Sequence, residues 1–248
     1  MVSFQKRVGD QFLVQRIQHA TLVSRVPHVN LPALEEFLES ISYPLHYLDF
    51  EAVNSAVPRY EGTRPWEHVP YLFSVHTEPG RGSELKHSWF LMDPRLDQRR
   101  DLLQALLSLT DAGTILVYGA TFETGILRRL AELFADESDR VESMIERVAD
   151  LLRPFNEFTF YHHHQRGKVS LKTVLPILTD ESYSGLTVKD GYSANLAYRY
   201  LVSSQADNGS SAETAALSDD LVQYCTMDTL AMVRIMSRLW QIAADGHE

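Results

Sequence analysis

The spacing of hydrophobic residues changes near residue 95, and this change separates a strand-rich segment from a helix-rich one. Residues 45–50, LHYLDF, form an apolar and aromatic run that predicts a buried central strand. Two further strands are predicted at 71–76 and 86–92, and the turn EPGRGS between them favours an antiparallel connection. The first segment therefore predicts three strands in meander order.

The second segment alternates between helical and extended patterns. Between Arg95 and Leu109 the apolar residues recur at helical spacing. Residues 114–118, TILVY, predict a fourth strand, and residues 122–134 predict a helix that follows it. Residues 139–152 either continue as a helix or pass into a fifth strand at VADLL, and the period leaves both open. The expected fold class is α/β, with a mixed sheet flanked by helices.

The two ends of the chain are predicted to be helical. Residues 1–40 form a helical lead-in or linker, in which Asn30 is a suitable N-cap and Pro32 lies in the first helical turn. One larger domain is expected over 41–244. Its remaining predicted segments are a His-rich loop at 156–169 and helices at 170–178, 192–203 and 212–242.

Composition and charge narrow the function classes. Cys225 is the only cysteine, which excludes an intrachain disulfide and multi-cysteine metal sites. A formal net charge of −10 argues against binding nucleic acid by bulk electrostatics. It does not argue against a metal-dependent nuclease, whose clustered carboxylates require bound cations. Because no apolar run approaches the roughly 20 residues that span a bilayer, we expect a cytoplasmic protein with no membrane partner.

A pair of acids ends the first predicted strand. Residues two apart on a strand point to the same face, so Asp49 and Glu51 project together while Phe50 packs on the other side. Two adjacent carboxylates repel each other, and such oxygen-rich pairs suit Mg²⁺ or Mn²⁺. The structural alternative is a strand end that runs into solvent, where both acids are hydrated.

Two other acids are candidates for the same site. Glu123 follows the fourth strand, in the first turn of a helix, where the helix dipole alone also explains an acid. Tyr224 and Asp228 are four residues apart on the last helix and therefore share one face. In the structural alternative Tyr224 lies in the core and Asp228 at its solvated border.

Taken together, these motifs resemble those of the DEDD, or DnaQ-like, 3′–5′ exonucleases of the ribonuclease-H-like superfamily. The shared features are Asp49-x-Glu51 on the first strand, an acid after the fourth strand, and Tyr224-x-x-x-Asp228 on the last helix. The tyrosine resembles the DEDDy subgroup, and Ser170-Leu-Lys172 is similar to a helix start that recurs in such enzymes.

The resemblance implies a ribonuclease-H-like, five-stranded mixed sheet and hydrolysis of DNA or RNA by two divalent cations, Mg²⁺ or Mn²⁺. It implies that Asp49, Glu51, Glu123 and Asp228 bind the metals, and that Tyr224 orients the attacking water. A phenol with an ordinary pKa near 10 does not act as a free base at neutral pH. The substrate implied is a nucleic acid with a single-stranded 3′ end.

A closer resemblance covers roughly residues 30–240. Segments such as YPLHYLDFEAV, SLKTVLP and YCTMDTLAM look like a bacterial family described only as a domain of unknown function. In that family the exonuclease-like region often follows a RecB-like nuclease domain of the PD-(D/E)XK kind. This resemblance implies a separate nuclease or repair protein as a further partner.

The chain departs from the exonuclease pattern at two positions. Glu123 stands where the family usually has Asp, and Gly119 stands where it usually has Asn. These departures favour an alternative function, a catalytically impaired module of the same fold that binds nucleic acid or a protein. The retained residues favour the active enzyme: Asp49, Glu51, Tyr224 and Asp228.

Weaker candidates lie outside the carboxylate motifs. Arg59, Arg64 and Trp66 follow the first strand in a long loop, where they are expected to meet phosphates and stack on a base, or simply to be solvated. Phe122 and Lys172 are similar candidates for substrate binding. The triplet at 162–164 suggests zinc, but adjacent side chains are expected to diverge, which favours a hydrated loop.

Overall fold

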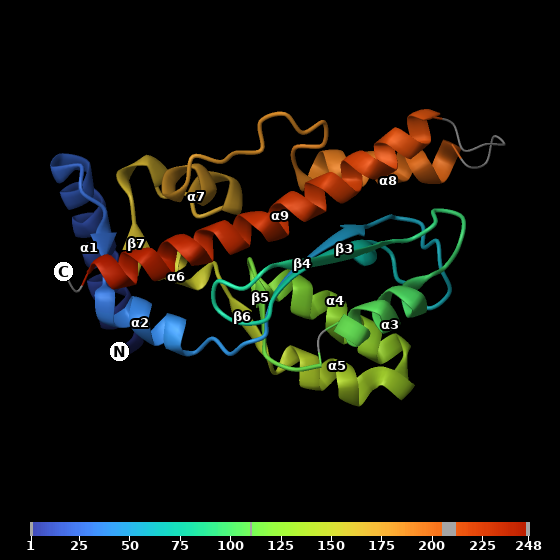
Figure 1. Cartoon of the computed structure of the whole chain (residues 1–248), viewed down its shortest axis with the longest axis horizontal. Coiled ribbons are helices and arrows are strands. Elements are labelled where there is room, and N and C mark those ends of the chain that lie inside the picture. The colour runs from blue at the N-terminus through green and yellow to red at the C-terminus, as the bar shows by residue number, and fades with distance from the viewer. Residues whose placement is uncertain (1, 110, 205–211, 247–248) are drawn as a thin grey trace. The chain divides into compact units, whose positions relative to one another are not determined.

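The computed structural model describes residues 2–109, 111–204 and 212–246 (Figure 1). The chain divides into two compact units. Unit 1 contains Met1–Ser40, Leu151–Ser182 and Arg234–Glu248, and unit 2 contains Ile41–Asp150 and Tyr183–Val233. No helix in the described part of the chain combines the length and the apolar character that crossing a membrane requires.

Unit 2 contains a five-stranded mixed sheet with the strand order β4-β3-β2-β5-β6. Strands β2, β3 and β4 pair antiparallel, whereas β5 pairs parallel to β2 and β6 pairs parallel to β5. The predicted meander, the parallel fourth strand and the α/β class are therefore confirmed. The strands are β2 (Leu45–Val53), β3 (Val69–Glu78), β4 (Lys86–Leu91), β5 (Thr114–Val117) and β6 (Val148–Asp150).

Helices cover both faces of this sheet. Helices α3, α4 and α5 lie together on one side in Figure 1, and the N-terminal part of α9 crosses the other side. The contact of α9 with the sheet is fixed by Cys225, which bonds to Asp49 on β2, and by Thr229, which bonds to Ser74 on β3. The helices of unit 2 are α3 (Arg99–Leu109), α4 (Ala120–Leu133), η1 (Ala135–Glu137), α5 (Ser138–Ile145), α8 (Gly191–Ser204) and α9 (Ala212–Asp245, which continues into unit 1).

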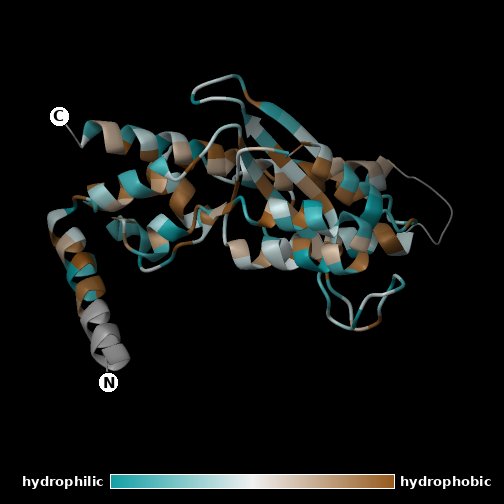
Figure 2. Cartoon of the chain, turned by 90° about the horizontal axis from the view of Figure 1, so that it is seen from below, coloured by the Kyte–Doolittle hydropathy of each residue, from teal (hydrophilic) through white to brown (hydrophobic). Residues whose placement is uncertain are grey.

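The core of unit 2 follows the predicted hydrophobic pattern. The apolar residues of β2 from Leu45 to Phe50 are buried on both faces, as expected for a central strand that is covered by helices. Leu102, Leu103 and Leu106 of α3 are fully buried, so the helical spacing correctly identified the inner face of that helix. Brown, apolar residues mark the strands in Figure 2, whereas the loops are mostly teal or white.

Both a helix and a strand occur in residues 139–152, where the hydrophobic period left these two possibilities open. Helix α5 ends at Ile145, and β6 then pairs with β5 in the register Ile115↔Val148. The strand has only three residues, too few for a period of two to be recognised in the sequence. Its position decides where Asp150 lies.

Unit 1 joins the N-terminal segment to residues 151–182. Strand β1 pairs antiparallel with β7, and the side chain of Asn30 caps α2 by accepting a hydrogen bond from the backbone of Ala33. The predicted loop at 156–169 contains β7 and the short helix η2, so that prediction was partly wrong. The elements are α1 (Val2–Ser24), β1 (His28–Val29), α2 (Leu31–Glu39), α6 (Arg153–Asn156), β7 (Phe160–Tyr161), η2 (His163–Gln165), α7 (Leu171–Leu178) and the end of α9.

Candidate functional site

Strand β2 and helix α9 bring three carboxylates of unit 2 together. Asp49 and Glu51 project from the same face of β2, and a bulge in the pairing with β3 follows Glu51. One carboxylate oxygen each of Asp49, Glu51 and Asp228 lies within 4.8 Å of the others. Glu51 is only 8% exposed, so a hydrated strand end does not describe it, and Asp228, at 7% exposed, does not lie at a solvated border. We call these three residues the acid cluster.

The acid cluster raises the pKa of Asp49 well above its ordinary range. Burial is the largest cause, followed by the negative charges of Asp228, Glu51 and Glu123. The thiol of Cys225, which donates to Oδ2 of Asp49 at 3.3 Å, acts in the opposite direction. Because burial and like charges both disfavour ionisation, the cluster retains protons unless a cation offsets the charge.

Glu123 lies next to the acid cluster but is not within its 4.8 Å group. Its side chain is 3% exposed, and burial, followed by the charge of Asp150, raises its pKa to about 8. Its Oε2 atom is shut off from solvent and has no hydrogen-bond partner among the described residues. A buried carboxylate oxygen without a partner is rare in folded proteins and points to a ligand such as an ion or a water molecule.

The start of helix α4 explains the glycine at position 119. Gly119 has φ +99°, a left-handed conformation that glycine adopts without strain and that asparagine also tolerates. The backbone N–H groups of Gly119 and Ala120 donate to the carboxylate of Asp150 at 2.8 and 3.0 Å. Asp150 therefore satisfies the N-terminus of the helix that carries Glu123. The sequence did not single out Asp150.

Two phenols surround Asp228. Tyr183 donates a hydrogen bond of 2.5 Å to Oδ1 of Asp228, and Tyr224 also hydrogen-bonds to this carboxylate. Burial and the charge of Asp228 raise the pKa of both phenols, so each remains a neutral donor at physiological pH. The Tyr-x-x-x-Asp spacing identified Tyr224, but nothing in the sequence linked Tyr183 to α9.

Cys225 and Tyr71 are further site residues that the sequence did not identify. Cys225 is fully buried, and burial and the charge of Asp49 raise the pKa of its thiol. Tyr71 on β3 is 1% exposed, and the charge of Glu51 adds to burial in raising the pKa of its phenol. The hydroxyl of Tyr71 is buried without a hydrogen-bond partner in the described structure.

A polar network holds α9 against β3 one residue beyond Asp228. Thr229 is fully buried, and its hydroxyl lies 2.9 Å from the hydroxyl of Ser74 and 2.8 Å from Nδ1 of His76. Ser74 also bonds to Nε2 of His87, whose ring stacks on that of His76 with centroids 4.3 Å apart. A satisfied buried network of this kind fixes the position of a helix.

The donor set of the acid cluster fits a hard divalent cation. Its ligands are carboxylate oxygens, which Mg²⁺ and Mn²⁺ prefer. The charges that perturb the pKa of Asp49 all belong to acidic side chains. They therefore include no lysine or arginine that would neutralise the acid cluster. The unpartnered Oε2 of Glu123 is consistent with a further ligand at its edge.

One comparison with known proteins gives a family. The model of a family described as a domain of unknown function, DUF2779, matches residues 46–170, about half of the chain. The chain belongs to the DUF2779 family. No curated protein and no solved structure matches it. The DUF2779 match includes Asp49, Glu51 and Glu123, whereas Asp228 lies beyond it.

Most of the predicted substrate-binding residues of this DUF2779 protein lie around the loop between β2 and β3. The guanidinium of Arg59 donates to the carbonyl of Pro94, while Trp66 is 64% exposed with φ +64°. Arg64 lies in the same loop, and its backbone N–H donates to Glu67. Phe122, at the start of α4, packs edge-on against a ring of this loop, His68.

Lys172 is the exception among the predicted substrate residues, because it belongs to unit 1. It lies in the first turn of α7 and is half-buried. The match to DUF2779 ends at residue 170, two residues before it.

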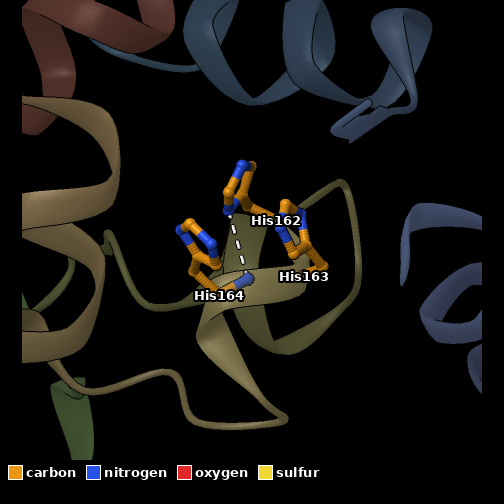
Figure 3. A group of neighbouring side chains, drawn as sticks. All are labelled: His162, His163 and His164. Carbon is orange, nitrogen blue, oxygen red and sulfur yellow. Dashed lines mark hydrogen bonds between the residues drawn. The ribbon is translucent and has the colours of Figure 1, made fainter. Parts of the chain in front are cut away.

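The histidine triplet of unit 1 does not diverge as expected. His162, His163 and His164 direct their rings to one side of the turn that includes η2 (Figure 3). One ring nitrogen of each lies within 4.8 Å of the others. The expectation from adjacency was wrong because His162 has extended backbone while η2 turns sharply after it, and Nδ1 of His162 accepts a hydrogen bond from the backbone of His164 at 3.2 Å.

Proposed function

We propose that this DUF2779 protein is a metal-dependent 3′–5′ exonuclease that hydrolyses phosphodiester bonds of DNA or RNA. The observation that carries the proposal is the acid cluster, in which Asp49, Glu51 and Asp228 meet although α9 is far from β2 in the sequence. Buried carboxylates that only repel one another destabilise a fold, and bound cations remove that repulsion.

The sheet supports the same proposal. A three-stranded antiparallel meander followed by two parallel strands is the arrangement that the resemblance to ribonuclease-H-like exonucleases implies. The first strand carries Asp49 and Glu51, the helix after the fourth strand carries Glu123, and the last helix carries Asp228. A fold alone does not establish a function, so the argument depends on the site.

The residues have distinct roles in this proposal. Asp49, Glu51 and Asp228 hold two divalent cations, and Glu123 completes the site directly or through water. Bound Mg²⁺ or Mn²⁺ supplies Lewis-acid chemistry that stabilises the charge developing on the phosphate and on the leaving 3′ oxygen. Tyr224 remains protonated and orients the attacking water by hydrogen bonding, since its raised pKa prevents it from acting as a base.

Substrate contacts in the proposal come from groups with an exposed face. Trp66 and Phe122 are 64% and 38% exposed, as base stacking requires. Arg59 and Arg64 supply phosphate contacts from the same loop. A single-stranded 3′ end is the proposed substrate, and a separate nuclease or repair protein is the proposed partner.

Glu123 favours a second candidate function. Its carboxylate is outside the 4.8 Å group and, with a pKa of about 8, is largely protonated at neutral pH. A site with only three carboxylates close together favours a catalytically impaired module that keeps the fold and binds nucleic acid or a protein.

The decisive experiment incubates the protein with 3′- and 5′-labelled single strands of DNA and of RNA in Mg²⁺ or Mn²⁺. We expect stepwise loss from the 3′ end that EDTA and Asp49→Asn both abolish. Asp93→Asn is the matched control, because Asp93 forms a surface pair with Arg95 in the same unit. Cleavage that persists in Asp49→Asn would refute the assigned site, and Mn²⁺ binding without cleavage would favour the impaired module.

A further inference from the structure

Unit 1 contains a cavity of about 390 Å³ that the proposed exonuclease site does not use. One wall belongs to α1, and the other belongs to β7 and the turn that follows it. The wall from α1 consists of Gln18, His19 and Leu22, and the opposite wall consists of Tyr161, His163 and Arg166. None of the described residues that line it is acidic.

Two arginines near this cavity have no acidic partner. Arg166 lines the cavity, and Arg25 lies close enough to His163 to contribute to lowering the pKa of that ring, after burial and His164. Neither guanidinium forms an ion pair with any carboxylate in residues 2–109, 111–204 and 212–246. By contrast, Arg153 in the same unit pairs with Glu157. In a chain of net charge −10, an unneutralised arginine that lines the cavity and a second one near His163 indicate an anionic ligand.

The backbone at these arginines is strained. Arg25 has φ +61° directly after α1, and Arg166 has φ +49° directly after η2. The left-handed residue that ends a helix is usually glycine, because a side chain there costs free energy. Arginine occupies this position after both α1 and η2.

The ring of His163 also lines the cavity. The same ring belongs to the histidine triplet, but a metal ion is disfavoured there for two reasons. Arg25 and Arg166 would repel a cation, and the Nδ1 lone pair of His162 already accepts the hydrogen bond from His164.

We propose that this cavity binds a phosphate group, with Arg25 and Arg166 as the charged contacts and His163 as a hydrogen-bond donor. The planar guanidinium fork matches phosphate oxygens in pairs, and charge-assisted bonds of this type are the strong ones. The phosphate comes either from a nucleic-acid backbone or from a small phosphorylated molecule. This inference is independent of the proposed exonuclease activity, because it concerns a cavity of unit 1.

The test measures binding of inorganic phosphate to the full chain by titration calorimetry. EDTA is present to prevent the proposed metal-dependent hydrolysis. The variant is Arg25→Gly with Arg166→Gly, since glycine suits both left-handed positions and should leave the thermal midpoint unchanged or raised. The matched control is Arg153→Gln with Arg238→Gln, which removes the same charge from exposed positions of unit 1. We expect the glycine pair to weaken phosphate binding about tenfold or more and the control to change it less than about twofold.

Competition with a single-stranded oligonucleotide identifies the source of the phosphate. Displacement of inorganic phosphate indicates a nucleic-acid backbone, and failure to displace it indicates a small phosphorylated molecule. Equal weakening in both double variants, or no phosphate binding by the unaltered chain, would overturn the proposal. The proposal would also be overturned if phosphate did not bind and Zn²⁺ bound at this cavity instead. In that case His163→Ala would abolish the Zn²⁺ binding.

Discussion

The hydroxyl of Tyr183 donates a 2.5 Å hydrogen bond to Oδ1 of Asp228, which joins the segment before α8 to helix α9 within unit 2. Tyr224 hydrogen-bonds to the same carboxylate from the preceding helical turn. Two neutral donors on one buried carboxylate fix its orientation. Asp228 is therefore held in one orientation beside two other acids.

Tyr183→Phe tests this orientation. Removal of one hydroxyl should lower the free energy of unfolding by about 1 kcal/mol, because a buried carboxylate loses a donor. It should also weaken Mn²⁺ binding roughly tenfold, as expected when a residue that orients a metal ligand is lost. Titration calorimetry measures the affinity. Tyr192→Phe, at a residue that is 75% exposed, is the control and should change neither quantity; equal affinities in all three proteins would contradict the prediction.

The contribution of Glu123 to the stability of the protein in EDTA should fall as the pH rises from 5 to 8. Burial raises the pKa of Glu123 from 4.5 to about 8, so the folded protein retains a proton that the unfolded chain releases. The stabilisation is complete below pH 4.5 and is lost as the pH approaches 8. Each kcal/mol lost lowers the melting temperature by about 2–4 °C.

Differential scanning fluorimetry of the wild-type protein and Glu123→Gln isolates the effect of Glu123, including its influence on Asp49, since the groups that Glu123 does not perturb titrate equally in both. The difference in melting temperature between them should shift in favour of the variant as the pH rises, and saturating Mn²⁺ should reduce the shift. A difference that is constant across the range would show that Glu123 ionises normally.

Cys225 should resist thiol reagents in the folded protein. The side chain is fully buried, and burial and nearby carboxylates raise its pKa, so the reactive thiolate does not form at pH 8. Reaction with Ellman's reagent should be slow without denaturant and should reach one thiol per chain in guanidinium chloride. Rapid labelling under native conditions would mean that α9 separates readily from β2.

Thr229→Val should destabilise the contact between α9 and β3. Valine has the same shape but lacks the hydroxyl that contacts Ser74 and Nδ1 of His76, so the cost should be about 1–3 kcal/mol. Thr226→Val on the same helix is the control. The hydroxyl of Thr226 makes only a 3.4 Å contact with His87, and its loss should cost less than about 0.5 kcal/mol. Urea unfolding curves measure both values, and equal costs would argue against the network.

The sequence predicted the elements that have long or regular patterns. The apolar run of β2, the helical spacing of α3 and the Asn30 cap were all recognisable because they depend on neighbouring residues. Elements of two or three residues, such as β6, β7 and η2, were missed or left open. Their conformation is fixed by pairing with distant strands, which a local period does not record.

Local spacing alone determined which side chains of the site share one face of an element. Asp49 and Glu51 share a face of a strand, and Tyr224 and Asp228 share a face of a helix. Folding decided which elements meet, because hydrogen bonds across the sheet and packing of α9 are interactions between residues far apart in the chain. It placed Asp228 within the acid cluster, left Glu123 just outside, and added Tyr183, Cys225 and Asp150, whose roles arise only from contact. It also turned three consecutive histidines to one side, since backbone conformation and not adjacency sets the direction of a side chain.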